Sequence, residues 1–171
     1  MRRVKFCMIS TVVAGLFAVN VGAQEQAVAA RCKAVHGDLV EAPSTTGCKP
    51  EHTSCFLGDV DANHGLRGTT YFKGDPGSVA FPPGAPNFRA YAGSFEYITQ
   101  HGTLVMREAG MTEPFTPSNP LSGVVNAYQR VVSGTGEFEG ATGYLFVSGF
   151  NRNQRVVTKL YGAICKQPHA Q

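Results

Sequence analysis

Short runs of β-branched and aromatic residues, bounded by glycine, proline, asparagine and aspartate, recur along most of this chain. Such runs are typical of β-strands, and no long segment carries a clean helical period of apolar residues. The pattern predicts eight strands, at 33–41, 54–62, 66–73, 94–100, 103–109, 124–133, 144–151 and 155–165. A short helical lead-in at 27–34 is the one helix that we expect. The sequence therefore predicts an all-β fold.

Two tight connections indicate antiparallel neighbours. His101-Gly102 and Arg152-Asn153 each separate two predicted strands, and two-residue connections join antiparallel pairs. Seven of the ten prolines fall in the segments 75–93 and 110–123. Because proline cannot donate to a central strand ladder, we expect long loops there, either as functional lids or as passive surface loops.

Eight short strands can close into a barrel or pack as a two-layer sandwich. Both faces of 94–100 and of 144–150 are partly apolar, as either architecture would require. A closed barrel also removes exposed sheet edges. We therefore expect a single eight-stranded antiparallel β-barrel, with the sandwich as the alternative.

The first 23 residues have the organisation of a signal peptide. Arg2, Arg3 and Lys5 precede an apolar stretch at 6–19, and small residues lead to Ala23. The stretch is shorter than the roughly 20 residues that a membrane-spanning helix needs. We expect cleavage after Ala23, a barrel domain at 24–171, and an exported protein, periplasmic or secreted, without membrane insertion.

The charge balance disfavours nucleic acid as a partner. Residues 1–23 contain three of the fifteen basic residues and none of the twelve acidic ones, so the mature chain has twelve of each. No lysine or arginine cluster remains to bind a polyanion. The same neutrality disfavours an anionic membrane surface.

The mature chain keeps four cysteines, at Cys32, Cys48, Cys55 and Cys165. An even number in an exported chain indicates two disulfides, for which three pairings exist. We favour Cys48–Cys55, which closes a short loop of turn residues, and consequently Cys32–Cys165, which ties the first predicted strand to the last.

A metal site is the alternative use of these cysteines. Zinc could bind Cys48, Cys55 and either His52 or His64, but the spacing fits no familiar zinc pattern. The segment 59–65 begins like a calcium loop but lacks the glycine and glutamate that such a loop requires. We therefore expect no metal.

The segment GTGEFEGATG, which begins at Gly134, is rich in glycine but does not fit a phosphate site. Its G-x-G-x-x-x-G spacing differs from a dinucleotide fingerprint, and a strand follows it where a helix would be needed. Glu137 and Glu139 would repel an anion. We expect a compact turn with solvated glutamates, in which Phe138 plugs one end of the core.

This segment, together with a final strand that ends in YGAIC at 161–165, resembles the allene oxide cyclase–dirigent barrel group. The specific resemblance covers about 131–165. It implies an eight-stranded antiparallel, calycin-like barrel with a cavity, in an exported bacterial relative. Plant members cyclise a fatty-acid epoxide or steer the coupling of phenoxy radicals. Their cavity residues lie mainly on strands without a motif match here, so no catalytic residue is transferred.

Candidate ligand-binding residues come from the strand pattern. Tyr97, Tyr144 and Tyr161 occupy positions that could point inward and bring hydroxyl groups into an apolar cavity. Glu41 ends the first strand and could lie at the cavity mouth. The alternative is that the tyrosines are ordinary barrel residues. The chain has no G-x-S-x-G or H-E-x-x-H motif, and we expect no cofactor.

Three functions follow from a small exported barrel. The leading hypothesis is non-catalytic binding of a small apolar molecule in the barrel, or of a partner through the proline-rich loops. A cofactor-free isomerase or cyclase is the alternative, and a fully packed structural barrel is the third. An open apolar cavity with a buried ionisable group would favour the enzyme. Whether copies associate into a homo-oligomer stays open.

Overall fold

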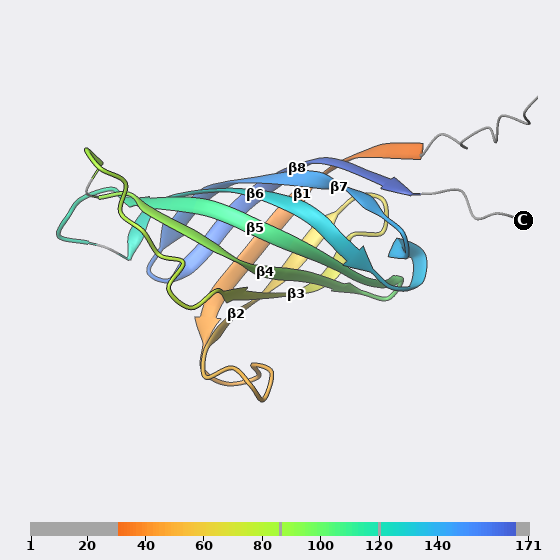
Figure 1. Ribbon diagram of the computed structural model, residues 1–171, viewed down its shortest axis with the longest axis horizontal. Helices are drawn as coiled ribbons and strands as arrows, with labels where there is room; N and C mark the ends of the chain where they lie inside the picture. Colours follow the sequence, from red (N-terminus) through yellow and green to blue (C-terminus); the bar gives the residue numbers. More distant parts are fainter. Residues whose placement is uncertain (1–30, 86, 120, 167–171) are drawn as a thin grey trace, which may run out of the picture.

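The computed structural model describes residues 31–85, 87–119 and 121–166, which form a closed barrel (Figure 1). Its strands are β1 (Arg31–Ser44), β2 (Cys55–Ala62), β3 (Arg67–Gly74), β4 (Arg89–Thr99), β5 (Gly102–Pro114), β6 (Ser122–Gly134), β7 (Thr142–Arg152) and β8 (Arg155–Lys166). Every strand pairs antiparallel with its sequence neighbours, and β1 pairs with β8. The predicted eight-stranded antiparallel barrel is confirmed, and the sandwich alternative is wrong.

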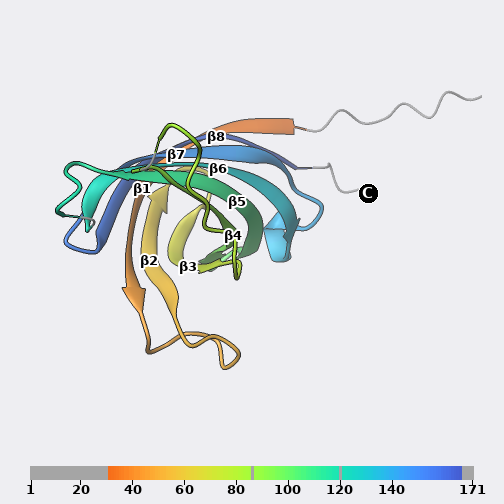
Figure 2. The same cartoon turned by 60° about the vertical axis from the view of Figure 1, so that its left-hand side comes forward.

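The side chains alternate between the barrel interior and its outer face, as the two-residue period of a strand requires. On β5, Leu104 and Met106 are fully buried while Arg107 is exposed. On β7, Leu145 and Val147 are buried while Phe146 is exposed. Figure 2 shows the strands curving around a shared interior, where these buried side chains form the core.

The two tight hairpins lie close to their predicted positions. Thr99 pairs with Gly102, so the first connection is Gln100 and His101. Arg152 pairs with Arg155, so the second connection is Asn153 and Gln154. Both of these last residues have positive φ angles, 51° and 67°, as in the type I′ turns that match the twist of the paired strands. Each connection was therefore predicted one residue away from its observed place.

One end of the barrel is closed by the segment rich in glycine. A short 3₁₀ helix, η1 (Gly136–Phe138), carries the buried Phe138 side chain into the core. Gly136 has a φ of 58°, and a Cβ there would lie 2.4 Å from the carbonyl oxygen of His101. Glycine is required at this position because no other residue fits both constraints. The predicted turn and the plug by Phe138 are confirmed.

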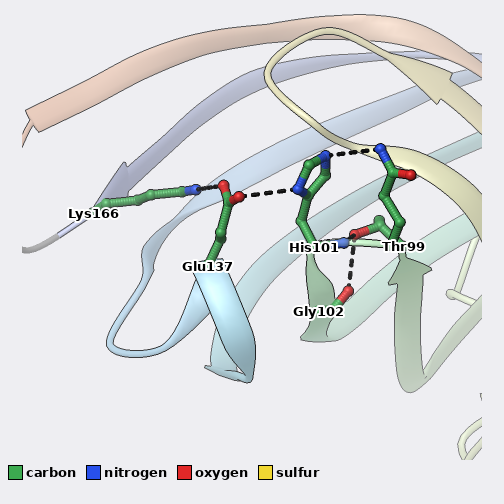
Figure 3. A network of polar contacts seen from close by, with 6 residues as sticks. Thr99, His101, Gly102, Glu137 and Lys166 are labelled. Carbon is green, nitrogen blue, oxygen red and sulfur yellow. Dashed lines mark hydrogen bonds and ion pairs between the residues drawn. The ribbon is translucent and has the colours of Figure 1, made fainter.

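A polar network fastens this plug to the neighbouring strands (Figure 3). The Glu137 amide N–H donates to the carbonyl oxygen of His101 at 2.8 Å. The Glu137 carboxylate contacts His101 Nδ1 at 2.9 Å and Lys166 Nζ at 3.4 Å. Although Glu137 is exposed, as expected, its side chain links the β4–β5 turn to the end of β8.

Both predicted disulfides are confirmed. Cys32 and Cys165 are register partners on β1 and β8, and their disulfide links the two strands whose pairing closes the barrel. The Cys48–Cys55 disulfide closes the loop between β1 and β2. A zinc site that uses these two cysteines is therefore wrong. The disulfides indicate a non-reducing environment.

Three further expectations need correction or lie outside the described residues. The predicted helix at 27–34 is wrong for residues 31–34, which form the start of β1. Residues 27–30 lie outside the residues that the structure describes. The signal peptide at 1–23 also lies outside them. The proline-rich segments are shorter loops than expected, at 75–88 and 115–121, because β4, β5 and β6 extend into them.

Phe138→Ala should destabilise the fold by about 3–5 kcal/mol, since it removes a buried aromatic ring and leaves a cavity. Urea unfolding of the purified protein measures this change. Glu139→Ala, at the exposed neighbouring position, is the control and should change stability by less than about 0.5 kcal/mol. Equal unfolding midpoints for the two variants would contradict the role of Phe138 as a plug.

Candidate functional site

The end of the barrel opposite to Phe138 contains a cavity of about 490 Å³. The loops at 45–54, 75–88 and 115–121 lie at this end, because all three follow odd-numbered strands in an antiparallel barrel. Apolar walls come from residues that include Phe56, Phe72, Val125, Val147 and Val156. The volume falls within the range of small-molecule sites.

Two carboxyl groups enter this apolar cavity from opposite parts of the barrel. Glu41 on β1 and Glu108 on β5 both line it, and both residues are buried. Each occupies an inward position of an otherwise apolar alternation, after Leu39 on β1 and after Met106 on β5. Burying carboxyl groups is costly unless they are hydrogen-bonded or neutral.

Glu108 ends a chain of hydrogen bonds that crosses the interior. The Tyr91 hydroxyl donates to Glu108 Oε1 at 2.9 Å, and Gln129 Nε2 donates to Glu108 Oε2 at 2.6 Å. The Tyr97 hydroxyl in turn donates to Gln129 Oε1 at 2.5 Å. Because Tyr97 occupies the amide oxygen, the Gln129 NH₂ group faces Glu108. Both oxygens of Glu108 thus accept hydrogen bonds, which favours its charged form.

Glu41 has weaker polar support. Its one side-chain hydrogen bond among the described residues comes from Thr70 Oγ1, at 3.4 Å. Burial, and secondarily the charge of Glu108, raise the pKa of Glu41 from its ordinary value of 4.5 to about 8. Glu41 is therefore a neutral carboxylic acid at neutral pH.

The two carboxyl groups differ in how strongly the protein stabilises their charged forms. Burial also raises the pKa of Glu108, but the hydrogen bonds from Gln129 and Tyr91 oppose that effect. Burial and the neighbouring Glu108 raise the pKa of Tyr91 far above its usual range, so its hydroxyl stays protonated. A protonated acid at the same cavity as a carboxyl group whose charged form accepts two hydrogen bonds can serve with it as a general acid and a general base.

Gly110 on β5 leaves the space that the Tyr91 ring occupies. A Cβ on Gly110 would lie 2.5 Å from both the Cζ atom and the hydroxyl oxygen of Tyr91. Any larger residue would push the ring away and break its hydrogen bond to Glu108. Gly110 therefore positions Tyr91 without contributing a functional group.

The cavity mouth is polar. Lys73 donates to the carbonyl oxygen of Ser54 at 2.9 Å, and Asp75 forms an ion pair with Arg107. Arg89 also lines the cavity and has no ion pair among the described residues. Asn151 also lines the cavity, and its buried Oδ1 atom has no hydrogen-bond partner among the described residues, which costs about 1–3 kcal/mol.

The predicted ligand-binding residues divide into two groups. Glu41 lines the cavity, and Tyr97 points inward as expected, although it is fully buried beneath the cavity. The inward orientation of Tyr144 and Tyr161 is wrong: they lie on the outer face, 43% and 53% exposed. Leu145 takes the inward register on β7, and Tyr144 is its neighbour.

Sequence reasoning missed Glu108, Tyr91 and Gln129. The sequence did contain a signal for Glu108. Leu104, Met106 and Glu108 are spaced two residues apart, so they lie on the same face of one strand, and burial of the two apolar residues indicates burial of the carboxyl group as well. Gln129 follows Val125 and Ala127 in the same way. Tyr91 gave no such signal because it lay in a segment predicted to be a loop.

No cluster of three or more potential metal-ligating side chains occurs in the part of the chain that the structure describes. Within the same residues, no helix has the length and apolar character to cross a membrane. Comparisons of this chain with protein-family models, with curated proteins and with solved structures find no match.

Glu41→Gln should remove a pH dependence of stability. The pKa of Glu41 is raised on folding, so its proton contributes stability that is complete below pH 4.5 and is lost as pH rises toward about 8. The loss amounts to a few kcal/mol, at roughly 1.4 kcal/mol per pKa unit.

Urea unfolding across this pH range measures the effect. We expect wild-type stability to fall with rising pH, and the Glu41→Gln variant to fall less and to be the more stable of the two above pH 8. Glu51→Gln, in the exposed loop, should behave as wild type. A Glu41→Gln profile parallel to that of wild type would contradict the elevated pKa of Glu41.

Proposed function

We propose that this protein is a cofactor-free acid–base catalyst, an isomerase or cyclase that acts on a small, largely apolar molecule in the barrel cavity. The observation that carries the proposal is the pair of buried carboxyl groups at one apolar cavity, Glu41 with an elevated pKa and Glu108 with two hydrogen-bond donors. Perturbed carboxyl groups in a cavity are typical of catalytic sites.

The chemistry follows from the protonation of each group. Glu41 donates its proton to a substrate oxygen as negative charge develops there, and Glu108 accepts a proton from a substrate carbon. Proton exchange with water after product release returns both carboxyl groups to their starting states. The substrate gains one proton and loses one, so the reaction is an isomerisation without a redox step. The apolar walls exclude water and strengthen both interactions.

The resemblance to the allene oxide cyclase–dirigent group supports the same class of reaction, because members of that group use a barrel cavity. The resemblance supplies no catalytic residue, so the assignment of Glu41 and Glu108 depends on their positions here. Export to the periplasm or the medium is part of the proposal. It is supported by the sequence of residues 1–23 and by the two disulfides.

The Kemp elimination of 5-nitrobenzisoxazole tests for a general base in the cavity. A carboxylate removes the ring C–H proton, the N–O bond breaks, and a coloured nitrophenolate forms. We expect Glu108→Gln to lower the rate by about 100-fold, the contribution typical of a general base.

Two variants serve as controls for this reaction. Glu41→Gln removes the acid and should keep most of the rate with this probe. Glu113→Gln alters the outer face of the same strand and should match wild type. Equal rates for wild type and Glu108→Gln would contradict a catalytic base at this position.

Non-catalytic binding is the second candidate, and one observation favours it. Both oxygens of Glu108 already accept hydrogen bonds from the protein, as they would in a network that only stabilises the barrel. Native mass spectrometry of the mature protein, purified without detergent, would then show a bound molecule that the protein leaves chemically unchanged. Conversion of that molecule by wild type, and not by Glu108→Gln, would contradict the binding hypothesis.

Partner binding through the proline-rich loops has a separate basis. Val79 and Phe81 in one loop, and Phe115 and Leu121 in the other, are exposed apolar side chains. They belong to the loops at the cavity end of the barrel, so a partner or a substrate entering the cavity would meet them first.

A further inference from the structure

On the outer face of the barrel, one row of register partners crosses five strands, with small side chains in one part of the row and large side chains in the other. From β4 to β8, the register partners are Ala92, Ala109, Tyr128, Phe146 and Tyr161. Two alanines are thus followed by three aromatic residues in one line across the sheet. None of these residues contributes to the cavity that holds Glu41 and Glu108.

The aromatic half of this row forms a ridge, which we define as Tyr128, Tyr144, Phe146 and Tyr161. Neighbouring ring centroids lie 5.4 to 6.2 Å apart, so the rings are in mutual contact. Their exposed fractions range from 39% to 53%. Contiguous exposed aromatic surface is typical of interaction sites.

The small half forms a groove beside the ridge. Ala90, Ala109 and Met111 line one part of a shallow depression of about 390 Å³. The depression continues past Asn126 and Ser148, and three ridge residues line it as well: Tyr128, Phe146 and Tyr161. Ala92 extends the small residues along β4. We define the alanine groove as Ala90, Ala92 and Ala109.

We propose that this face forms a two-fold symmetric homodimer, in which the aromatic ridge of each copy packs into the alanine groove of the other. A two-fold interface uses the same patch on both copies and therefore requires a self-complementary surface. A ridge and a groove side by side on one face meet this requirement.

The strand register shows how well the two halves match. When two such faces meet, a two-fold axis that lies in the interface, parallel to the strands and between β5 and β6, places β6 of one copy over β5 of the other. Tyr128 of one copy then lies over Ala109 of the other. The same rotation places Phe146 on β7 over Ala92 on β4, in the same row.

The next row toward the plugged end is compatible with this symmetry. It consists of Ser94, Arg107, Arg130 and Tyr144 as register partners from β4 to β7. The rotation brings Tyr144 over the small Ser94, so a third ring of the ridge also meets a small residue. The rotation also brings Arg130 over Arg107. Arg107 is paired with Asp75 within its own copy, whereas Arg130 has no ion pair among the described residues, so Asp75 has to balance both guanidinium groups.

The next row toward the cavity end carries no charge in its central part. Its register partners are Ala90, Met111, Asn126 and Ser148. The rotation brings Ala90 over Ser148 and Met111 over Asn126. The Ser148 hydroxyl already donates to Asn126 Oδ1 within one copy, at 2.7 Å, so this polar pair enters the interface with a hydrogen bond in place.

The surface area is sufficient for a dimer. At roughly 150–250 Å² per aromatic side chain, the exposed parts of the four ridge residues amount to about 350 Å². A standard interface buries about 800 Å² per partner. The alanine groove, Met111 and the exposed Phe150 and Val157 nearby supply surface for the remainder.

Sedimentation analysis of the mature protein over a concentration series tests the proposal. We expect a wild-type dimer. Tyr128→Glu places a charge on the ridge, and Ala109→Arg fills the groove, so each should weaken dimerisation by roughly 30-fold or more, as for a central interface residue. Ile98→Glu, an exposed apolar position near the plugged end of β4, should leave the dimer intact.

Mixing the Tyr128→Glu and Ala109→Arg variants gives the sharpest result. In a mixed dimer, the introduced carboxylate of one copy faces the introduced guanidinium of the other, and the second contact keeps the wild-type Tyr128 and Ala109. We therefore expect dimers to reappear. A monomeric wild type, an Ala109→Arg variant that still dimerises, or a mixture that stays monomeric would each overturn the proposal.

Near-ultraviolet circular dichroism checks the folding of each variant. If Tyr128→Glu does not fold, Ala109→Arg alone decides the outcome, because it leaves the aromatic ridge unchanged and acts only on the groove. A folded Ala109→Arg monomer beside a wild-type dimer supports the proposal.

Discussion

The pairing of β1 with β8 is the constraint on which the rest of this structure depends. It runs from Arg31–Lys166 to Glu41–Val156, so the strand that carries Glu41 is also the strand that closes the barrel. The Cys32–Cys165 disulfide covalently links the same two strands at the plugged end. Without this closure Glu41 would lie on a sheet edge exposed to water, where its pKa would be ordinary. Barrel closure and an unusual carboxyl group are therefore two consequences of one pairing.

Much of the fold could be predicted because local signals agreed with one another. The glycine-bounded runs located all eight strands. The even number of cysteines that follow the predicted signal peptide indicated two disulfides, and both predicted pairings are present. The strand ends were less accurate, since Arg89 to Ala92 and Gly110 to Pro114 are paired despite their proline-rich neighbourhoods. Proline marks the positions that cannot donate to a ladder, but it does not determine where pairing stops on either side. The closed topology had to be chosen over a sandwich by the cost of exposed edges.

The site was harder to predict. The buried face of a strand can be identified from sequence only when the side chains on its two faces differ clearly in polarity. On β7, apolar residues alternate in both registers, one beginning at Leu145 and the other at Tyr144. The inward orientation was predicted for the Tyr144 register, because a tyrosine hydroxyl could line a cavity. The structure buries the aliphatic set and leaves the rings outside, where they form the ridge. On β5 the contrast was informative, because Glu108 follows Leu104 and Met106. The hydrogen bonds to Glu108 join β4, β5 and β6, and contacts of that kind depend on the register between strands.

The proposed chemistry depends on Glu41 holding a proton at neutral pH beside an open apolar cavity. Carbon-13 nuclear magnetic resonance of the glutamate side-chain carboxyl groups, titrated with pH and assigned through Glu41→Gln, measures this directly. The structure predicts a Glu41 titration midpoint near 8. A midpoint near the ordinary value of 4.5 would contradict it, because Glu41 would then be a solvated carboxylate with no proton to transfer.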